Sequence, residues 1–239
     1  MASYKVQELD LVSVPLPERT ETYTPLPNRL IIDTVRENFA ANNMKILAEG
    51  YGMDRTNGVF IGKYAVQGME DNGINMMLGW MNSYDKSKRF QIGSGGVVMV
   101  CSNGMFISDL LEMTKHTSGV LPRFEQMVNN SIMSIENELV HLVKVKKEFE
   151  TVQVSKSAIN EILGKMFFED SLVNTTQANI IKEGLTKDKN FNLLVPERQN
   201  LWSMYNLITE SLKTQHPSTY FKTHIEAYNF IKDQIEVLA

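Results

Sequence analysis

The chain has 239 residues, of which 43% are hydrophobic and 22% charged, enough apolar material for one large folded domain or two small ones. The formal net charge is −4, and the parts of the chain on either side of Leu110 each carry a small acidic excess. Bulk charge therefore weighs against tight, non-specific binding to duplex nucleic acid, but it is compatible with a local basic face.

The single cysteine, Cys101, excludes an internal disulfide and a metal site built on several cysteines. The N-terminus lacks the basic and apolar segments of a secretory signal. No apolar run approaches the roughly 18 residues that a membrane-spanning helix needs. We therefore expect a cytoplasmic protein that does not span a membrane and binds no metal or cofactor.

Residues 1–27 form a mixed segment that contains Pro15, Pro17, Pro25 and Pro27. Because proline discourages helix and favours extended backbone, we expect an extended N-terminal arm. Such an arm packs on the body of the protein or on a neighbouring subunit, or it remains a partly ordered tail.

A helix is predicted to begin at Asn28 and to end at Asn42 and Asn43. Its apolar residues recur at helical spacing: Leu30, Ile31, Val35 and Phe39. The pattern then changes to a period of two, which predicts strands at Met44–Tyr51, Val59–Val66, Ile74–Met81 and Phe90–Cys101. Turn-forming residues separate these strands, so an antiparallel meander with the helix on one face is expected.

From about Ser108 to the end of the chain the pattern is helical. The longest predicted helix, Arg123–Glu150, carries a near-heptad apolar stripe: Val128, Ile132, Ile135, Leu139, Leu142 and Phe149, with Lys146 at the remaining position. This stripe either packs along the helix's own domain or forms a self-association seam between subunits. Further helices are predicted at Ser155–Phe168, Thr175–Leu185, Glu197–Thr214 and Pro217–Leu238.

The predicted fold class is therefore α+β, with an N-terminal antiparallel sheet and its covering helix followed by a helical C-terminal half. The expected organisation is an extended arm at residues 1–27, an antiparallel α+β domain at residues 28–119 and a helical region at residues 120–239.

The sequence contains no complete catalytic motif. The glycines of IGSGGVV neither precede a Gly-Lys-Ser/Thr sequence nor open a helix, so a strand irregularity explains them better than a nucleotide-binding loop. Cys101 and His116 are a conceivable thiolate–imidazole pair, but the apolar run VVMVC favours a buried, inert thiol. We therefore expect a protein that is not an enzyme.

The segment from Leu78 to Gly104 contains the densest mixture of basic and aromatic residues. The cations of its turn are Lys86, Lys88 and Arg89, and the candidate aromatic residues are Trp80, Tyr84 and Phe90. Cations that bind phosphates beside rings that stack on bases are typical of proteins that hold unpaired nucleic acid. The alternative is an ordinary solvated turn, since Asn-Ser and Asp-Lys are also turn formers.

Two further basic groups are candidates for phosphate contacts. Lys115 and His116 lie near a predicted helix end, where they either bind phosphate or form a capping or turn cluster. Lys144, Lys146 and Lys147 alternate with glutamates along the long helix, which favours a solvated face over the wall of a nucleic-acid groove.

Four short motifs follow one another between about residues 25 and 120: LPNRLIIDTVRENF, NSYDKS, VMVCSNG and KHT. In this series the chain resembles a family of phage- and plasmid-encoded proteins of unknown function. It is also similar to phage proteins that bind single-stranded DNA and assist the phage RNA polymerase and replication. The resemblance implies single-stranded DNA, and phage RNA polymerase or replication proteins, as partners in the host cytoplasm.

These patterns together predict a phage-encoded, homo-oligomeric, non-catalytic protein that binds single-stranded DNA and supports phage transcription or replication. The alternative is a protein-interaction module that inhibits a host defence enzyme. A mild acidic charge and the lack of a recognisable active site fit that alternative as well.

Overall fold

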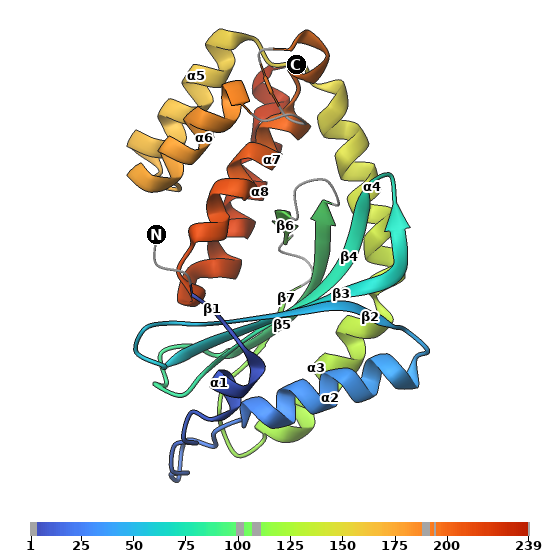
Figure 1. The fold of residues 1–239 in the computed structure, drawn as a ribbon, viewed down its shortest axis with the longest axis vertical. Helices are drawn as coiled ribbons and strands as arrows, with labels where there is room; N and C mark the ends of the chain where they lie inside the picture. Colours follow the sequence, from blue (N-terminus) through green and yellow to red (C-terminus); the bar gives the residue numbers. More distant parts are fainter. Residues whose placement is uncertain (1–3, 99–102, 107–110, 188–191, 194, 239) are drawn as a thin grey trace.

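A computed structural model describes residues 4–98, 103–106, 111–187, 192–193 and 195–238 of the chain. Its centre is a seven-stranded antiparallel sheet with the order β1-β2-β3-β4-β5-β6, in which β7 also pairs with β5 (Figure 1). The strands are β1 (Lys5–Val6), β2 (Ile46–Met53), β3 (Val59–Asp71), β4 (Ile74–Ser83), β5 (Phe90–Val98), β6 (Asn103–Met105) and β7 (Leu111–Thr114).

Strands β2 to β5 form the meander that the period-two pattern predicts. β3 and β4 meet in a tight hairpin, in which Asp71 pairs with Ile74. The two turn residues, Asn72 and Gly73, both have positive φ angles, of 49° and 74°. Asn-Gly favours such a turn because glycine has no Cβ and asparagine tolerates the left-handed region. The meander and the α+β class are confirmed.

The outer edge of β5 has two partners. β6 pairs with residues 96–98 and β7 pairs with residues 90–93. The prediction of helix from Ser108 onward is therefore wrong for β7, which spans 4 residues. A strand this short shows no clear period, and its pairing with the edge of β5 decides its backbone conformation.

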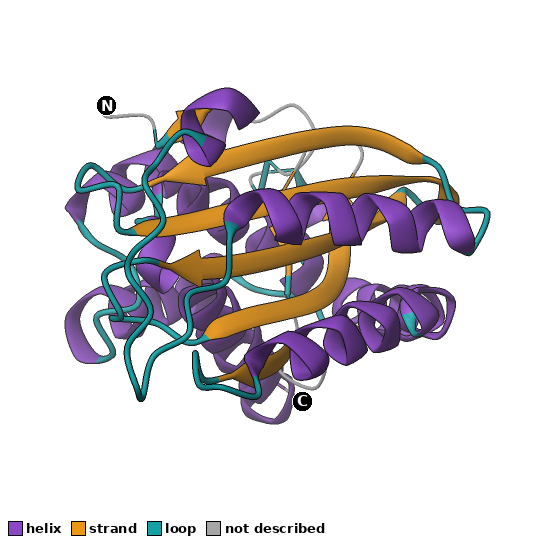
Figure 2. Cartoon of the chain, turned by 90° about the horizontal axis from the view of Figure 1, so that it is seen from below, coloured by secondary structure: helices purple, strands orange, loops and turns teal. Residues whose placement is uncertain are grey.

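Helices cover both faces of the sheet (Figure 1; Figure 2 shows the sheet from the side of α2 and α3). The helices on the lower side are α1 (Glu8–Val12), α2 (Asn28–Ala41) and α3 (Val120–Met133). Those on the upper side are α7 (Leu201–Ser211) and α8 (Tyr220–Leu238). The helix α4 (Ile135–Thr151) runs along β4 and β5, and α6 (Thr175–Lys187) packs on α7. The remaining elements are α5 (Lys156–Gly164), a π-helical turn (Lys165–Glu169) and 3-10 turns at Pro196–Arg198, Leu212–Thr214 and Pro217–Thr219.

Alternate residues of the central strands belong to different hydrophobic clusters. The larger cluster, which includes α2, takes Phe60, Tyr64 and Trp80, whereas the smaller one, which includes the start of α8, takes Ile61, Met77 and Met81. Every residue of β4 is buried. The sheet is therefore covered on both faces along its centre, and exposed side chains are left mainly at the strand ends.

The long helix predicted at Arg123–Glu150 is two helices, because α3 ends and α4 begins at Ser134. The predicted apolar stripe lies in the protein's own core, with Leu139 partly buried and Val128, Ile132, Ile135, Leu142 and Phe149 fully buried. Packing of the stripe along its own domain is confirmed. Its interpretation as a self-association seam is wrong, since the same chain already covers it.

The N-terminal arm packs on the body of the protein, and Leu11, Tyr23 and Leu26 are buried there. The expectation of extended backbone is wrong for α1, which precedes the first proline of the arm. A reciprocal capping box between Gln7 and Asp10 stabilises the start of that helix.

The boundary expected between residues 119 and 120 does not separate two hydrophobic cores. The larger cluster extends along the sequence from Leu11 to Ile231 and includes side chains of α2, β3, β4, α4 and α7. The helices of the C-terminal half therefore complete the same core as the sheet.

A substitution in β3 tests this packing. Gly62 lies opposite Trp80, and a Cβ added to Gly62 would overlap the indole ring. Because Trp80 is fully buried and rigid, we expect Gly62→Ala to lower the free energy of unfolding by about 1–3 kcal/mol in urea denaturation. Gly50→Ala in β2 is the matched control, because a Cβ there would meet no atom within 4 Å. Equal urea midpoints for the two variants would contradict the packing.

Candidate nucleic-acid interface

The turn between β4 and β5 is held in shape by its own hydrogen bonds. The Ser83 hydroxyl donates to the carbonyl of Lys88 at 2.9 Å and accepts a bond from the amide of Lys88 at 3.1 Å. Lys86 adopts the left-handed conformation, with φ of 65°. The turn therefore presents Lys86, Lys88 and Arg89 on an ordered backbone.

A buried pair of asparagines fastens the N-terminal arm beside this turn. The Asn82 amide group donates to the carbonyl of Leu26 and to the side-chain oxygen of Asn28, both at 2.8 Å. The arm thereby places Tyr23 so that its ring centre lies 4.8 Å from the ammonium group of Lys86. Burial raises the pKa of Tyr23 to about 12, so its hydroxyl stays neutral at physiological pH.

The segment after β7 completes this end of the sheet. The amide of Thr24 donates to the carbonyl of His116 at 2.9 Å, and the His116 and Tyr23 rings lie 5.7 Å apart. The result is a pocket of about 360 Å³. The predicted site residues that line it are Lys86, Lys88, Arg89, Lys115 and His116. The fold thus brings together residues that are distant in the sequence.

A second pocket, of about 400 Å³, shares Arg89 and Lys115 with the first. Its lining also includes Arg123 from the first turn of α3 and the carboxylate of Glu112 in β7. We name as the basic rim the cations that line the two pockets: Lys86, Lys88, Arg89, Lys115 and Arg123. Within the described ranges, none of these cations lies within ion-pairing distance of a carboxylate.

Arg123 is the member of the rim that the sequence interpretation missed. It marks the expected start of the long helix, but it belongs to no basic run, and with Phe124 as its one adjacent ring it does not form a dense cluster of cations and rings like that of the β4–β5 turn. Only the packing of α3 beside β5 and β7 brings it to Arg89 and Lys115.

His116 lines the first pocket, and the hydrogen-bonding capacity of its imidazole ring is unsatisfied. The residue is 7% exposed, and neither ring nitrogen has a hydrogen-bond partner among the described residues. Burial lowers the pKa of its imidazole, so the ring is neutral at physiological pH. An unpartnered polar group at this depth costs free energy that a hydrogen bond to a ligand would recover.

The predicted stacking roles of Trp80 and Phe90 are wrong, because both side chains are fully buried. The indole N–H of Trp80 donates to the hydroxyl of Tyr64 at 3.3 Å, under the helix layer. The Phe90 ring packs edge-on against Phe124 of α3, with 5.2 Å between the ring centres. Neither ring offers a face to a base.

Tyr84 is half-buried and connects the turn to α2. Its hydroxyl accepts a hydrogen bond from the amide of Asn28 at 2.9 Å, and its ring packs on Phe60. Tyr84 therefore helps to position the arm and the turn. None of the three predicted stacking rings, Trp80, Tyr84 and Phe90, is fully exposed to a base.

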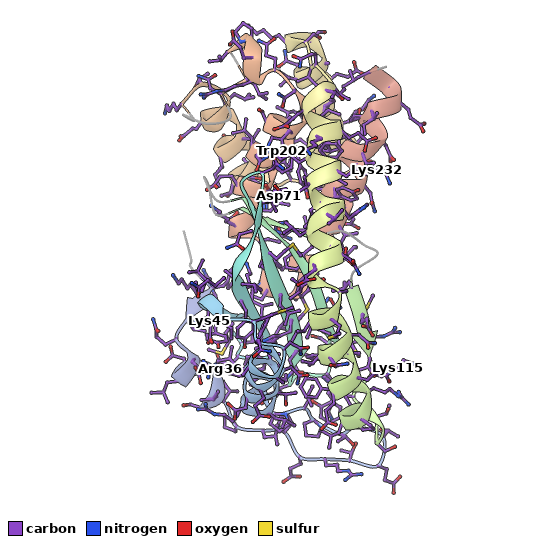
Figure 3. The ribbon with its side chains drawn as sticks, turned by 90° about the vertical axis from the view of Figure 1, so that its right-hand side faces the viewer. Arg36, Lys45, Asp71, Lys115, Trp202 and Lys232 are labelled. Atoms are coloured by element: carbon purple, nitrogen blue, oxygen red, sulfur yellow. The ribbon has the colours of Figure 1, made fainter. Side chains whose placement is uncertain are left out.

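The lysines of α4 lie apart from the basic rim. Lys146 donates to the carbonyl of Asn72 in the β3–β4 hairpin and pairs with Glu150. That hairpin is at the opposite end of β4 from the β4–β5 turn, and Figure 3 shows its Asp71 far from Lys115 along the molecule. Lys144 and Lys147 are exposed on the same helix, so the predicted basic residues form two separate groups, not one channel.

Cys101 lies outside the described residues, so the conceivable pairing with His116 is not described either. In the described part of the chain, no three His, Cys, Asp or Glu side chains are grouped as a metal site would require. Across the same ranges, no helix combines the length and the apolar character needed to cross a membrane.

Comparison with known proteins gives one match. The model of a family described as "Domain of unknown function (DUF932)" matches residues 15–230, a range that contains the basic rim and most of the helical half. No curated protein and no solved structure matches the chain. Because the match covers most of the sequence, the chain belongs to the DUF932 family, whose function is unknown.

Proposed function

We propose that the protein binds single-stranded DNA through its phosphates, using the basic rim, and that it supports phage transcription or replication without catalysing a reaction. The observation that carries this proposal is the convergence of cations from the β4–β5 turn, the segment after β7 and α3 around two adjoining pockets. Cations that converge in this way attract a polyanion even on a protein of net charge −4.

The chemistry of the rim favours backbone recognition over base recognition. Trp80 and Phe90 are buried, so the basic rim supplies ammonium and guanidinium groups but no exposed stacking ring. Contacts with phosphate position a strand without reading its sequence. The protein is therefore expected to bind strands of different sequence with similar affinity.

The size and setting of the two pockets favour an unpaired strand. Pockets of about 360 and 400 Å³ match the scale of single nucleotides, and the overall acidity of the chain opposes the broad electrostatic footprint of duplex binding. In this proposal the partners are single-stranded DNA and the phage RNA polymerase or replication proteins. The protein acts as a homo-oligomer in the host cytoplasm.

The salt dependence of binding measures how many phosphates the rim contacts. With three to five of its cations engaged, the logarithm of the association constant should fall with the logarithm of salt concentration with a slope between about −2 and −3.5. Fluorescence anisotropy of a labelled oligonucleotide at several salt concentrations gives this slope. No binding at low salt would refute the proposal and favour the protein-interaction alternative.

A matched pair of charge reversals locates the site. Lys88→Glu combined with Arg89→Glu should weaken oligonucleotide binding by about tenfold or more, because two phosphate contacts become repulsive. Lys144→Glu combined with Lys147→Glu makes the same change of net charge on α4 and should leave the affinity nearly unchanged. Anisotropy at constant ionic strength compares the two variants. A loss confined to the α4 variant would move the site to that helix.

The buried imidazole predicts a pH dependence. The pKa of His116 is lowered in the free protein, and a bound phosphate would raise it by stabilising the protonated ring. Binding then takes up a proton, so affinity should rise as pH falls from 7.5 to 5.5, by up to about tenfold per pH unit. The other ionisable residues that line this pocket are Tyr23, Lys86, Lys88, Arg89 and Lys115.

His116→Gln is the control for this pH dependence, because its amide keeps a polar group in the wall but does not titrate. Its affinity should be the same at pH 5.5 and 7.5, once thermal unfolding has shown that both proteins remain folded over that range. An equally steep pH dependence in the His116→Gln variant would exclude a role for the imidazole.

A further inference from the structure

The start of α8 lies beside β1 and the sheet (Figure 1). Residues from these elements line a third pocket. We name it the edge cavity. It has a volume of about 460 Å³, and its walls come from β1 and the residue before it, from β2 and β3, and from the connection between α7 and α8. It shares no lining residue with the two pockets of the basic rim, so a ligand in the edge cavity is independent of the proposed function.

At Gly50, the backbone of β2 lines the edge cavity with no side chain above it. Gly50 pairs with Lys63 across β2 and β3, so a side chain at Gly50 would project from the same face of the sheet as that of Lys63. A Cβ added to Gly50 would meet no atom within 4 Å. Gly62 and Gly79 differ, because a Cβ there would collide with Trp80 or Phe106. Neighbouring rings fill the space above those glycines, whereas the space above Gly50 is empty.

The walls combine positive charge with apolar surface. Lys5, Lys63 and Lys213 line the cavity together with Ile61, Pro217 and Tyr220, and no described lining residue is acidic. Lys213 pairs with Glu210, outside the lining. The ammonium group of Lys63 lies 3.7 Å from the centre of the Tyr220 ring and, among the described residues, forms no ion pair with a carboxylate.

A half-buried ammonium group beside apolar side chains and an uncovered stretch of backbone suits a ligand that has both an anionic group and a flat apolar ring. The anion would pair with Lys63 in a site partly shielded from water, where charge-assisted hydrogen bonds are strongest. The Tyr220 ring is 4% exposed and its face is occupied by Lys63, so it positions the ammonium group. The ligand ring would lie against the apolar lining of Ile61 and Pro217 and against the peptide groups of β2, in the space that a side chain at position 50 would fill. The volume of the cavity is within the range of small-molecule sites.

We infer that the edge cavity binds a small aromatic anion, with Lys63, held against the Tyr220 ring, as the partner of its charged group and Gly50 as the residue that leaves room for its ring. The ligand class is an aromatic sulfonate, carboxylate or phosphate of about the size of a nucleotide.

The test uses 8-anilinonaphthalene-1-sulfonate, a fluorescent aromatic sulfonate, with the full chain. We expect saturable binding at one site per chain. Gly50→Leu should weaken binding by about tenfold or more by filling the cavity, and Lys63→Met should weaken it similarly by removing the charge while keeping the apolar stem. Gly164→Leu in α5 is the steric control, because a Cβ at Gly164 also meets no atom within 4 Å but lies away from the cavity.

Thermal unfolding of each variant shows whether it is folded before its affinity is compared. Retention of wild-type affinity by the folded Gly50→Leu and Lys63→Met proteins would overturn the inference, as would an equal loss in Gly164→Leu. Adenosine monophosphate and benzenesulfonate, added as competitors, distinguish a nucleotide-selective cavity from one that accepts aromatic anions generally. Failure of both to displace the probe would also count against a site for this ligand class.

Discussion

Burial of the central sheet on both faces is the constraint on which the rest of the structure depends. Every residue of β4 is buried, with Trp80 under the helix layer of α2 and Met77 and Met81 under the start of α8. Aromatic side chains in the middle of these strands therefore contribute to the core and are unavailable to a ligand. Because charged groups are costly to bury, the cations of the basic rim gather where the strands end, and Lys63 within β3 lies beside the uncovered backbone at Gly50.

Both candidate sites lie where the helices no longer cover the sheet. The basic rim lies at the end of β4 and β5, where the hydrogen bonds of Ser83 and Asn82 hold the turn and the N-terminal arm in fixed positions. The edge cavity lies at the β1–β2 edge, where Gly50 leaves the sheet uncovered. In the basic rim, hydrogen bonds within the turn and between the turn and the N-terminal arm fix the shape of the site. In the edge cavity, the missing side chain at Gly50 provides the space for a ligand.

Much of the fold was predictable because its signals are local. The start of α2 at Asn28 follows from helical periodicity after a proline-rich segment, and the β3–β4 hairpin follows from Asn72-Gly73 between alternating residues. The break at Ser134 and the short strand β7 were not predictable. The apolar stripe continues across the break, and β7 depends on pairing with β5, a contact between segments that are distant in the sequence.

The sequence by itself determined the helix α2, the antiparallel meander β2 to β5 and the cations of the β4–β5 turn, because a few neighbouring residues set period, turn chemistry and charge. Only the tertiary structure decided which of the candidate residues face a ligand. Period-two alternation shows that the side chains of Trp80 and Phe90 project from the opposite sheet face to those of their neighbours in the chain. It does not show that helices cover both faces of the sheet. Likewise, only long-range packing brings His116 and Arg123 to the turn, because their positions depend on β7 and α3 docking beside β5.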